Sequence, residues 1–190
     1  MTSLSTSATY WDAQHAMNTW MLGASDPTEV LSLHGMNPRA LRVLDIGIGT
    51  GEMSSKLCDL GNDVVGCDVS PVSLSKLDSR SRGILLDVLS EEQPFDVAIM
   101  HLVAQHLDDV ELLYVLSNVR LTPTGILSVQ WIDYECHQTF EYPMFSRSQD
   151  QMGHLFERSG KSMLSCLEVK SGCFGSDSGS RWRWLVGVAR

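Results

Sequence analysis

The stretch Val43-Leu-Asp-Ile-Gly-Ile-Gly-Thr-Gly51 decides the fold of this chain. The apolar run 41–46 predicts a short buried strand. Three glycines follow it at alternate positions, Gly47, Gly49 and Gly51. Glycines let the backbone turn sharply and come close to a ligand. A helix is expected at 52–60, so its free N–H groups face whatever lies at the loop. The stretch predicts a strand, a ligand-binding loop and a helix.

Strands and helices alternate along the rest of the chain. Further core strands are predicted at 64–67, 83–86, 95–100 and 126–131, the last after a turn at 122–125. Helices are expected to start at Ser70-Pro71 and to run over 108–120 and 148–158. The tail offers two strands, 162–169 and 183–188, joined by the loop 171–180. This order predicts an α/β fold with a doubly wound, mostly parallel sheet and an antiparallel edge.

Length and composition predict a single globular domain of 190 residues. Within it we expect a helical N-terminal cap at 1–40, including a helix start at Ser25-Asp26-Pro27, and a ligand-binding core at 41–131. The remainder, 132–190, is expected to hold a lid segment, a helix and a strand hairpin. The final strand, if exposed, is a place where two copies can pair, so a homodimer is possible.

Charge and cysteine content narrow the function classes. The net charge of −9 disfavours a general nucleic-acid binder, because phosphate backbones repel an acidic chain. There is no run of 18 apolar residues and no signal-peptide pattern, so we expect no membrane partner. Five cysteines without a CxxC pair are typical of reduced thiols, which favours a cytoplasmic location.

The glycine loop differs from the dinucleotide fingerprint in one decisive residue. GxGxxG needs its third glycine at position 52, where this chain has Glu52. Glu52 and Asp45 repel a pyrophosphate, so the loop suits a phosphate-free ligand with a cationic group. Asp68 ends the second strand, where a carboxylate accepts both hydroxyls of a ribose. Asp87 ends the third strand and can accept from the amine of adenine. These features together describe S-adenosylmethionine.

Each acidic residue also has a plainer interpretation. Asp68 can serve only as a helix N-cap or turn residue, and Asp87 can belong to a helix-start signal. The position of Asp68 after the glycine loop favours the functional interpretation.

The chain resembles the class I S-adenosylmethionine-dependent methyltransferases, particularly the type that acts on small molecules. The matching stretches are VLDIGIGTG (43–51), VVGCDVS (64–70), LLDV (85–88), FDVAIMHLVAQHLDD (95–109) and LTPTGILSVQW (121–131). The resemblance implies a Rossmann-like sheet of seven strands, with an antiparallel C-terminal strand, and the cofactor S-adenosyl-L-methionine, with S-adenosyl-L-homocysteine as product.

The resemblance also implies roles for individual residues. The methionine portion of the cofactor is expected at Gly47, Ile48, Gly49 and Gly51; the ribose at Asp68 and Val69; and the adenine at Asp87 or Val88. Asp45 is expected to hold the loop and to reach the amino group of the cofactor through water. Tyr10 is a candidate for closing over the cofactor.

Two histidines are candidates for a general base. Methyl transfer needs a base only when the nucleophile carries a proton, as a hydroxyl does, and histidine suits that role. His101 directly follows the fourth strand, so it is also expected near the cofactor. His106 precedes a helix and matches a histidine common in the family, although it can equally pack or hydrogen-bond at the helix start. We predict O-methylation of a small molecule.

Substrate recognition is expected from two aromatic-rich segments. One contains Tyr10, Trp11, His15 and Trp20, and the other is 131–147. Both suit a lid over a small ligand, although aromatics can also simply cover a sheet edge. Asp133, Glu135 and His137 alternate along the second segment, which more often marks an exposed edge than a metal site, so no metal is expected.

Three other functions are compatible with these patterns. The chain can methylate a protein or an RNA site, or it can bind S-adenosylmethionine without catalysis, as a partner subunit or sensor. A nicotinamide-dependent oxidoreductase is disfavoured by Glu52.

Overall fold

The structure is a computed structural model. It describes residues 4–17, 28, 31–32, 34–132, 144–169 and 184–190. The expected helix start at 25–27, the loop at 171–180, Trp20 and the candidate ligands Asp133, Glu135 and His137 lie outside the described residues.

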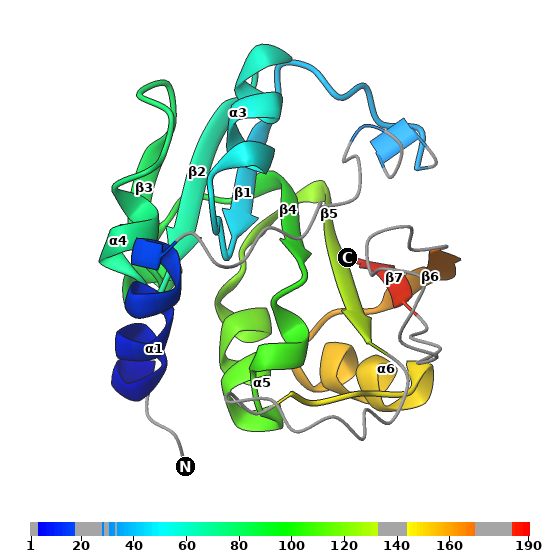
Figure 1. Cartoon of the computed structure of the whole chain (residues 1–190). Helices are drawn as coiled ribbons and strands as arrows, with labels where there is room; N and C mark the ends of the chain where they lie inside the picture. The colour runs from blue at the N-terminus through cyan, green and yellow to red at the C-terminus, as the bar shows by residue number, and fades with distance from the viewer. Residues whose placement is uncertain (1–3, 18–27, 29–30, 33, 133–143, 170–183) are drawn as a thin grey trace.

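A single seven-stranded sheet organises the molecule (Figure 1). Its order is β3-β2-β1-β4-β5-β7-β6. Strands β1 to β5 are parallel to one another, and β7 runs antiparallel to both of its neighbours, β5 and β6. The strands are β1 (Arg42–Ile46), β2 (Asp63–Asp68), β3 (Arg82–Leu85), β4 (Phe95–His101), β5 (Leu121–Ile132), β6 (Met163–Val169) and β7 (Trp184–Ala189). The predicted doubly wound α/β sheet with an antiparallel C-terminal strand is confirmed.

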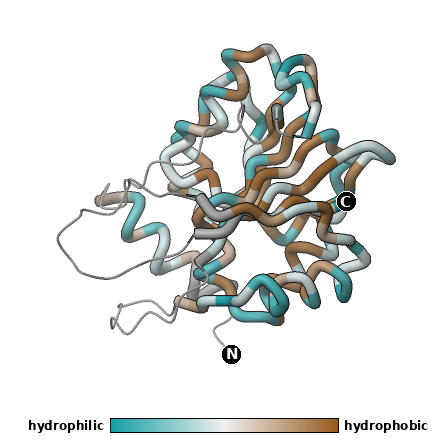
Figure 2. Tube along the Cα trace, turned by 90° about the vertical axis from the view of Figure 1, so that its right-hand side faces the viewer, coloured by the Kyte–Doolittle hydropathy of each residue, from teal (hydrophilic) through white to brown (hydrophobic). Residues whose placement is uncertain are grey.

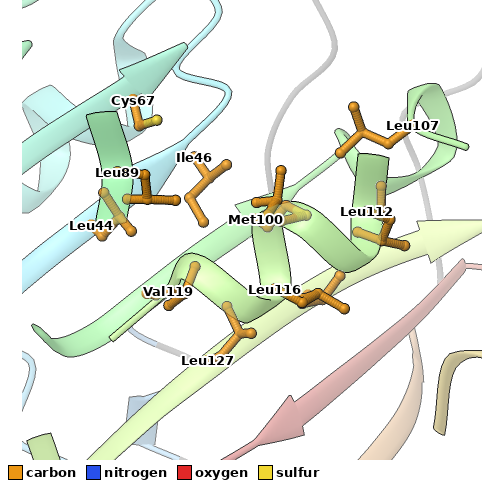
Figure 3. Close-up of a cluster of buried hydrophobic side chains, with 14 of the residues drawn as sticks. Leu44, Ile46, Cys67, Leu89, Met100, Leu107, Leu112, Leu116, Val119 and Leu127 are labelled. Atoms are coloured by element: carbon orange, nitrogen blue, oxygen red, sulfur yellow. The ribbon is translucent and has the colours of Figure 1, made fainter. Parts of the chain in front are cut away.

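Two apolar layers cover the two faces of the sheet. Along β1, Val43 joins one core cluster and Leu44 the other, because successive side chains of a strand point to opposite faces. The first face packs against α3 (Glu52–Asp59) through Met53 and Leu57. The second packs against α5 (Asp109–Asn118) and α6 (Gln149–Arg158), and Figure 3 shows its central side chains. Hydrophobic residues accordingly concentrate in the strands (Figure 2).

Side-chain caps fix where the helices begin. Asp108 accepts hydrogen bonds from the first turn of α5, and the Glu111 side chain accepts from the Asp108 N–H in return. Ser148 and Gln151 form the same capping box at α6. The predicted helices at 108 and 148 are therefore placed correctly.

The N-terminal part contributes α1 (Leu4–Met17), which lies beside α4 (Pro71–Leu74) at the β2–β3 side of the sheet (Figure 1). The helix expected from Ser70-Pro71 is only this one turn, capped by Ser70. Within the described residues, no helix is long and apolar enough to cross a membrane.

Two sequence predictions need correction. The turn expected at 122–125 lies inside β5, where the register moves from Phe95↔Leu121 to Val97↔Ile126. Four residues of β5 bulge out there without ending the strand. Asp87 does not close the third strand, because β3 ends at Leu85 and Asp87 belongs to the 3₁₀ helix η1 (Leu86–Glu91). The alternative interpretation of Asp87, as part of a helix start, is therefore the one that the structure has.

Candidate active site

The glycine loop is held in place by contacts with the strands and the helix around it. The Asp45 side chain is buried, and it accepts a hydrogen bond of 2.6 Å from the Ser54 hydroxyl of α3. The Gly47 N–H donates to the Cys67 carbonyl at 2.7 Å, which ties the loop to the end of β2. Burial raises the pKa of Asp45 to about 6. Asp45 therefore links β1 to α3 and holds the loop between them.

Because Gly47 has no side chain, Val103 can pack directly against its backbone. The φ of Gly47 is +74°, and a Cβ there would lie 2.2 Å from Cγ2 of Val103. Val103 follows β4, so this contact joins the loop to the end of a second strand. Leu102, which lies between the end of β4 and Val103, adopts a positive φ of 63°. This conformation costs a non-glycine residue about 1–2 kcal/mol. Strain of this kind persists where surrounding packing enforces it, commonly at functional sites.

Asp68 stands at the end of β2 with its carboxylate directed to the loop. It accepts from the Ser70 N–H at 2.9 Å and from the Gly49 N–H at 3.4 Å. The side chain is buried, and this burial raises its pKa. Asp68 is thus part of a turn, as the plainer interpretation held, and it also shares one site with the glycine loop.

The end of β3 offers a different surface. Asp87 and Val88 are exposed on η1, as is Leu85 at the last position of β3. Leu85 pairs with Asp68 in the sheet register. Val69, next along from Asp68, is partly buried and packs on the core. Beside the buried carboxylate of Asp68 there is therefore an exposed apolar and acidic rim.

Helix α1 contributes side chains that the sequence did not assign to the loop. His15 is buried, and its Cε1 lies 4.0 Å from the position of a Cβ on Gly49. Burial lowers the pKa of His15, while the nearby Asp68 opposes that effect. Asp12 accepts a 2.5 Å hydrogen bond from the Ser70 hydroxyl. Tyr10, the candidate for closing over the cofactor, packs edge-on against Trp11 at 5.1 Å between ring centroids.

His101 ends β4 on the sheet face that α3 covers, the same face as Asp45, since Asp45 pairs with Ile99. Its Nε2 lies 2.9 Å from the Ser128 hydroxyl of β5. Among the described residues, its buried Nδ1 has no hydrogen-bond partner. Burial lowers the pKa of His101 to about 4. The ring is neutral at pH 7 and retains one unsatisfied nitrogen.

His106 lies in the 3₁₀ helix η2 (Ala104–His106) and is held from two sides. Its Nε2 is 3.2 Å from the Gln105 amide nitrogen. Its ring meets Trp11 of α1 edge-on, with centroids 4.9 Å apart. Burial lowers the pKa of His106 to about 4. Through Trp11, this histidine connects η2 to the helix that lies over the glycine loop.

A buried arginine anchors η2 to the chain that leads into α6. The Arg147 side chain is 3% exposed. It donates to the Ala104 carbonyl at 2.8 Å, to the Leu107 carbonyl at 2.6 Å and to Asp109 at 2.9 Å. Arg147 ends the aromatic-rich segment 131–147, and no local pattern there predicts a buried arginine that binds distant backbone carbonyls.

Other residues of the site carried a weak signal or none. Ser128 and Gln130 alternate along the apolar run of β5, so both polar side chains fall on one face of a buried strand. Asp12 and Ser54 reach the site only through tertiary contacts. Across the described ranges, no group of three His, Cys, Asp or Glu side chains is arranged to hold a metal ion.

Comparison with known proteins finds a matching family model and curated relatives. Residues 44–129 match the family described as "Methyltransferase domain". The ubiquinone biosynthesis O-methyltransferase of Rhizobium etli is 31% identical over 118 residues, covering 57% of this chain and 46% of that protein. The corresponding protein of Mesorhizobium japonicum is 28% identical over 121 residues, covering 55% and 49%. The chain spans about half the length of these curated relatives.

Solved structures share the fold at low sequence identity. Magnesium protoporphyrin IX methyltransferase from Synechocystis, solved with bound S-adenosylhomocysteine, superposes with a TM-score of 0.72 at 14% identity, covering 98% of both chains. A Burkholderia thailandensis N1-methyltransferase reaches 0.68 at 16% identity, covering 98% of this chain and 86% of the other. The [4+2]-cyclase SpnF reaches 0.62 at 18% identity, over 80% and 74%. The fold thus also supports other reactions.

The matched domain, the aligned O-methyltransferases and the sheet order agree with one another. Residues 44–129 match a methyltransferase-domain family, and the sheet has the fold of solved methyltransferases. The resemblance drawn from the sequence is confirmed.

Proposed function

We propose that this chain transfers a methyl group from S-adenosyl-L-methionine to a hydroxyl oxygen of a small molecule, leaving S-adenosyl-L-homocysteine. The main support for this cofactor is the hydrogen bond from the Gly49 N–H to Asp68, which joins the glycine loop and the carboxylate of β2 in one site. The curated relatives are O-methyltransferases, and this supports oxygen as the accepting atom.

The residues at the strand ends fit this cofactor. Gly47 has no room for a side chain because of Val103, and both Gly47 and Gly49 have the positive φ that favours glycine, which leaves a bare backbone for the methionine portion to approach. Asp68 would accept hydrogen bonds from the ribose hydroxyls. The exposed Asp87 and Val88 would meet the adenine, one by accepting from its amine and the other by apolar contact. Glu52 and Asp45 oppose a phosphate-bearing ligand.

For methyl transfer the protein must align the acceptor oxygen with the methyl group and supply a group that accepts one proton. When bound, the cofactor supplies a methyl group on a sulfonium: the hydroxyl oxygen forms the new bond to carbon, the old bond's electron pair returns to sulfur, and the hydroxyl proton leaves. His101 and His106 are the buried neutral imidazoles at the end of β4 and in η2 that can take this proton. The aromatic residues of α1 would exclude water from the site.

The first test of this proposal is ligand binding followed by turnover. We expect thermal unfolding to shift upward with S-adenosylmethionine and S-adenosylhomocysteine and to stay unchanged with NAD. Ligand at about a hundred times its Kd adds about 2.7 kcal/mol, which is several degrees at this size. Radiolabelled methyl transfer to a panel of hydroxylated aromatic and aliphatic metabolites then identifies the acceptor class. A shift with NAD alone would overturn the assignment.

The same assay separates the remaining alternatives. Label recovered in protein or RNA after incubation with cell extract would favour a macromolecular substrate. Tight binding of S-adenosylmethionine without transfer to any acceptor would favour a sensor or partner subunit.

A cytoplasmic location and a homodimer belong to the same proposal. Cys58 and Cys67 are buried free thiols, which are typical of proteins from reducing compartments. The final strand, β7, lies between β5 and β6 and is not an edge, so a second copy would pair instead at the edge strand β6, which exposes Leu164 and Leu167. Analytical ultracentrifugation tests the dimer.

A further inference from the structure

The unsatisfied nitrogen of His101 is unusual in a protein interior. More than nine in ten buried polar groups have a hydrogen-bond partner, so an exception calls for a specific cause. His101 is 8% exposed, and Nδ1 has no partner among the described residues. Two residues further along, Val103 packs on Gly47. The orphaned nitrogen therefore belongs to the strand end that contacts the cofactor loop.

The two candidate bases are held in different ways. A neutral imidazole has one nitrogen that donates and one that accepts, and the partner of one nitrogen fixes the state of the other. The Gln105 amide nitrogen donates to the Leu102 carbonyl at 2.7 Å, which fixes the orientation of that amide. The same nitrogen faces Nε2 of His106 at 3.2 Å and can only donate there. His106 therefore accepts at Nε2 and carries its proton on Nδ1, which like Nδ1 of His101 is buried and forms no hydrogen bond with the described residues.

The partner of His101 is a hydroxyl, which can accept as well as donate. When Ser128 Oγ accepts from Nε2–H, the lone pair lies on Nδ1, the nitrogen without a partner. When Ser128 donates instead, both rings present an N–H, and neither offers a basic nitrogen for a hydroxyl proton. Only the first arrangement gives the site a base.

We propose that Ser128 is a positioning residue that accepts the Nε2–H of His101, so that His101 takes the substrate proton at Nδ1, while Gln105 holds His106 as a hydrogen-bond donor. This inference rests on the proposed methyl transfer. The proton leaves the hydroxyl for Nδ1 as the oxygen bonds to the methyl carbon, and His101 later returns it to water.

The weak basicity of His101 is compatible with this role. Burial lowers its pKa to about 4, and no charged group contributes to that shift. An oxygen that is gaining a methyl group is a far stronger acid than a neutral hydroxyl, so a weakly basic imidazole accepts its proton. The same low pKa makes the imidazolium release the proton readily and restores the neutral ring.

The decisive measurement reads the tautomer without any turnover. In the ¹⁵N-histidine spectrum of the whole chain, assigned by His101→Gln and His106→Gln, we expect His101 protonated at Nε2 and His106 at Nδ1. In Ser128→Ala the His101 signals should move toward a mixture of tautomers, and Ser128→Thr should restore the original pattern. Ser159→Ala is the matched control, because it removes a hydroxyl bond at the end of α6, away from the site.

The kinetic counterpart separates positioning from binding. We expect Ser128→Ala to lower kcat about 10-fold to 100-fold, and His101→Gln to lower it about 100-fold or more, with S-adenosylhomocysteine affinity within about twofold. His106→Gln should cost less than about tenfold in kcat. A wild-type His101 protonated at Nδ1 would overturn the proposal, as would an equal or larger kcat loss in His106→Gln. Should Ser128→Ala fail to fold, the wild-type and Ser128→Thr spectra still decide.

The two proposals fail differently. Lack of S-adenosylhomocysteine binding by the wild type would reject the proposed function, whereas a wrong tautomer with intact binding and transfer would reject only the role of Ser128.

Discussion

Near the ends of β1 and β2 the buried polar side chains are carboxylates, Asp45 and Asp68. At the end of β4 and beside it on β5 they are the neutral groups His101, Ser128 and Gln130. We call these regions the cofactor half and the acceptor half of the site. The carboxylates accept from serine hydroxyls and backbone N–H groups. His101 keeps one nitrogen without a partner among the described residues.

The difference follows the chemistry that each half must perform. A sulfonium and an ammonium group are cationic, so fixed negative charge in the cofactor half favours their binding. Removing a hydroxyl proton instead needs an uncharged acceptor in dry surroundings, where burial keeps an imidazole neutral. The four predictions below change one half at a time, so each shows whether binding and chemistry divide in this way.

The largest effect is expected from Gly47→Ala in the cofactor half. The new methyl group would meet Val103 at 2.2 Å, and the backbone would keep its φ of +74°. Overpacking and the positive φ together cost about 3–5 kcal/mol in the free energy of unfolding, and S-adenosylhomocysteine binding should be lost. Urea denaturation and calorimetry measure the two effects.

Gly61→Ala is the matched control for that change. Gly61 has a φ of +81° and nothing within 4 Å of an added Cβ. It should cost only about 1–2 kcal/mol and leave binding intact. Equal losses in the two variants would show that the contact between the loop and Val103 is unimportant.

Arg147→Lys tests the anchor of the acceptor half. A lysine cannot make the bonds to the Ala104 and Leu107 carbonyls and to Asp109 together. We expect a loss of about 2–4 kcal/mol in the free energy of unfolding, because buried carbonyls lose their donors. Turnover should fall while S-adenosylhomocysteine affinity stays within about twofold.

The exposed Arg158→Lys at the end of α6 is the control and should change stability by less than about 0.5 kcal/mol. If Arg147→Lys weakened cofactor binding as much as it lowered kcat, the separation of the two halves would be refuted.

The buried Asp45 predicts a pH dependence that its variants should change. Its folded pKa is about 6, above the value of about 3.9 in an unfolded chain. Between these values the folded state holds the proton and the unfolded state does not, so the free energy of unfolding falls as the pH rises. Relative to Asp45→Asn, the wild type should lose at most about 3 kcal/mol between about pH 4 and pH 6, and nothing further above that interval.

Ser54→Ala sharpens this measurement. The Ser54 hydroxyl bond lowers the pKa of Asp45, so its removal should extend the loss of stability to higher pH. Urea titrations across the pH series provide the data, and parallel curves for the wild type and Asp45→Asn would contradict the prediction.

Asp68→Asn should have the smallest effect, and mainly on affinity. Loss of a charged acceptor for a ribose hydroxyl should raise the Kd for S-adenosylhomocysteine about 10-fold to 100-fold. Asp63→Asn, at the exposed start of the same strand, is the control and should leave the Kd unchanged. Calorimetry at matched folded fractions decides, and a change below about twofold for Asp68→Asn would remove this residue from the site.

Local patterns were enough for most of the fold. The strands around Leu44 and Val97, the caps at Asp108 and Ser148, and the glycine loop are set by neighbours in the chain. Patterns failed where a distant strand overrode them. Residues 122–125 look like a turn, yet β4 keeps them within β5 as a bulge. At Asp87 the sequence offered both strand end and helix start, and the structure has the latter.

The sequence by itself determined the class of protein, because the glycine loop and the acid of the next strand lie within one short stretch and need each other's spacing. Only the tertiary structure decided how the two halves are built. His15 reaches Gly49 from α1, Ser128 meets His101 across two strands, and Arg147 binds the carbonyls of η2. Each contact joins residues far apart in the chain. The hydrogen bonds among them stabilise the site only where packing excludes water.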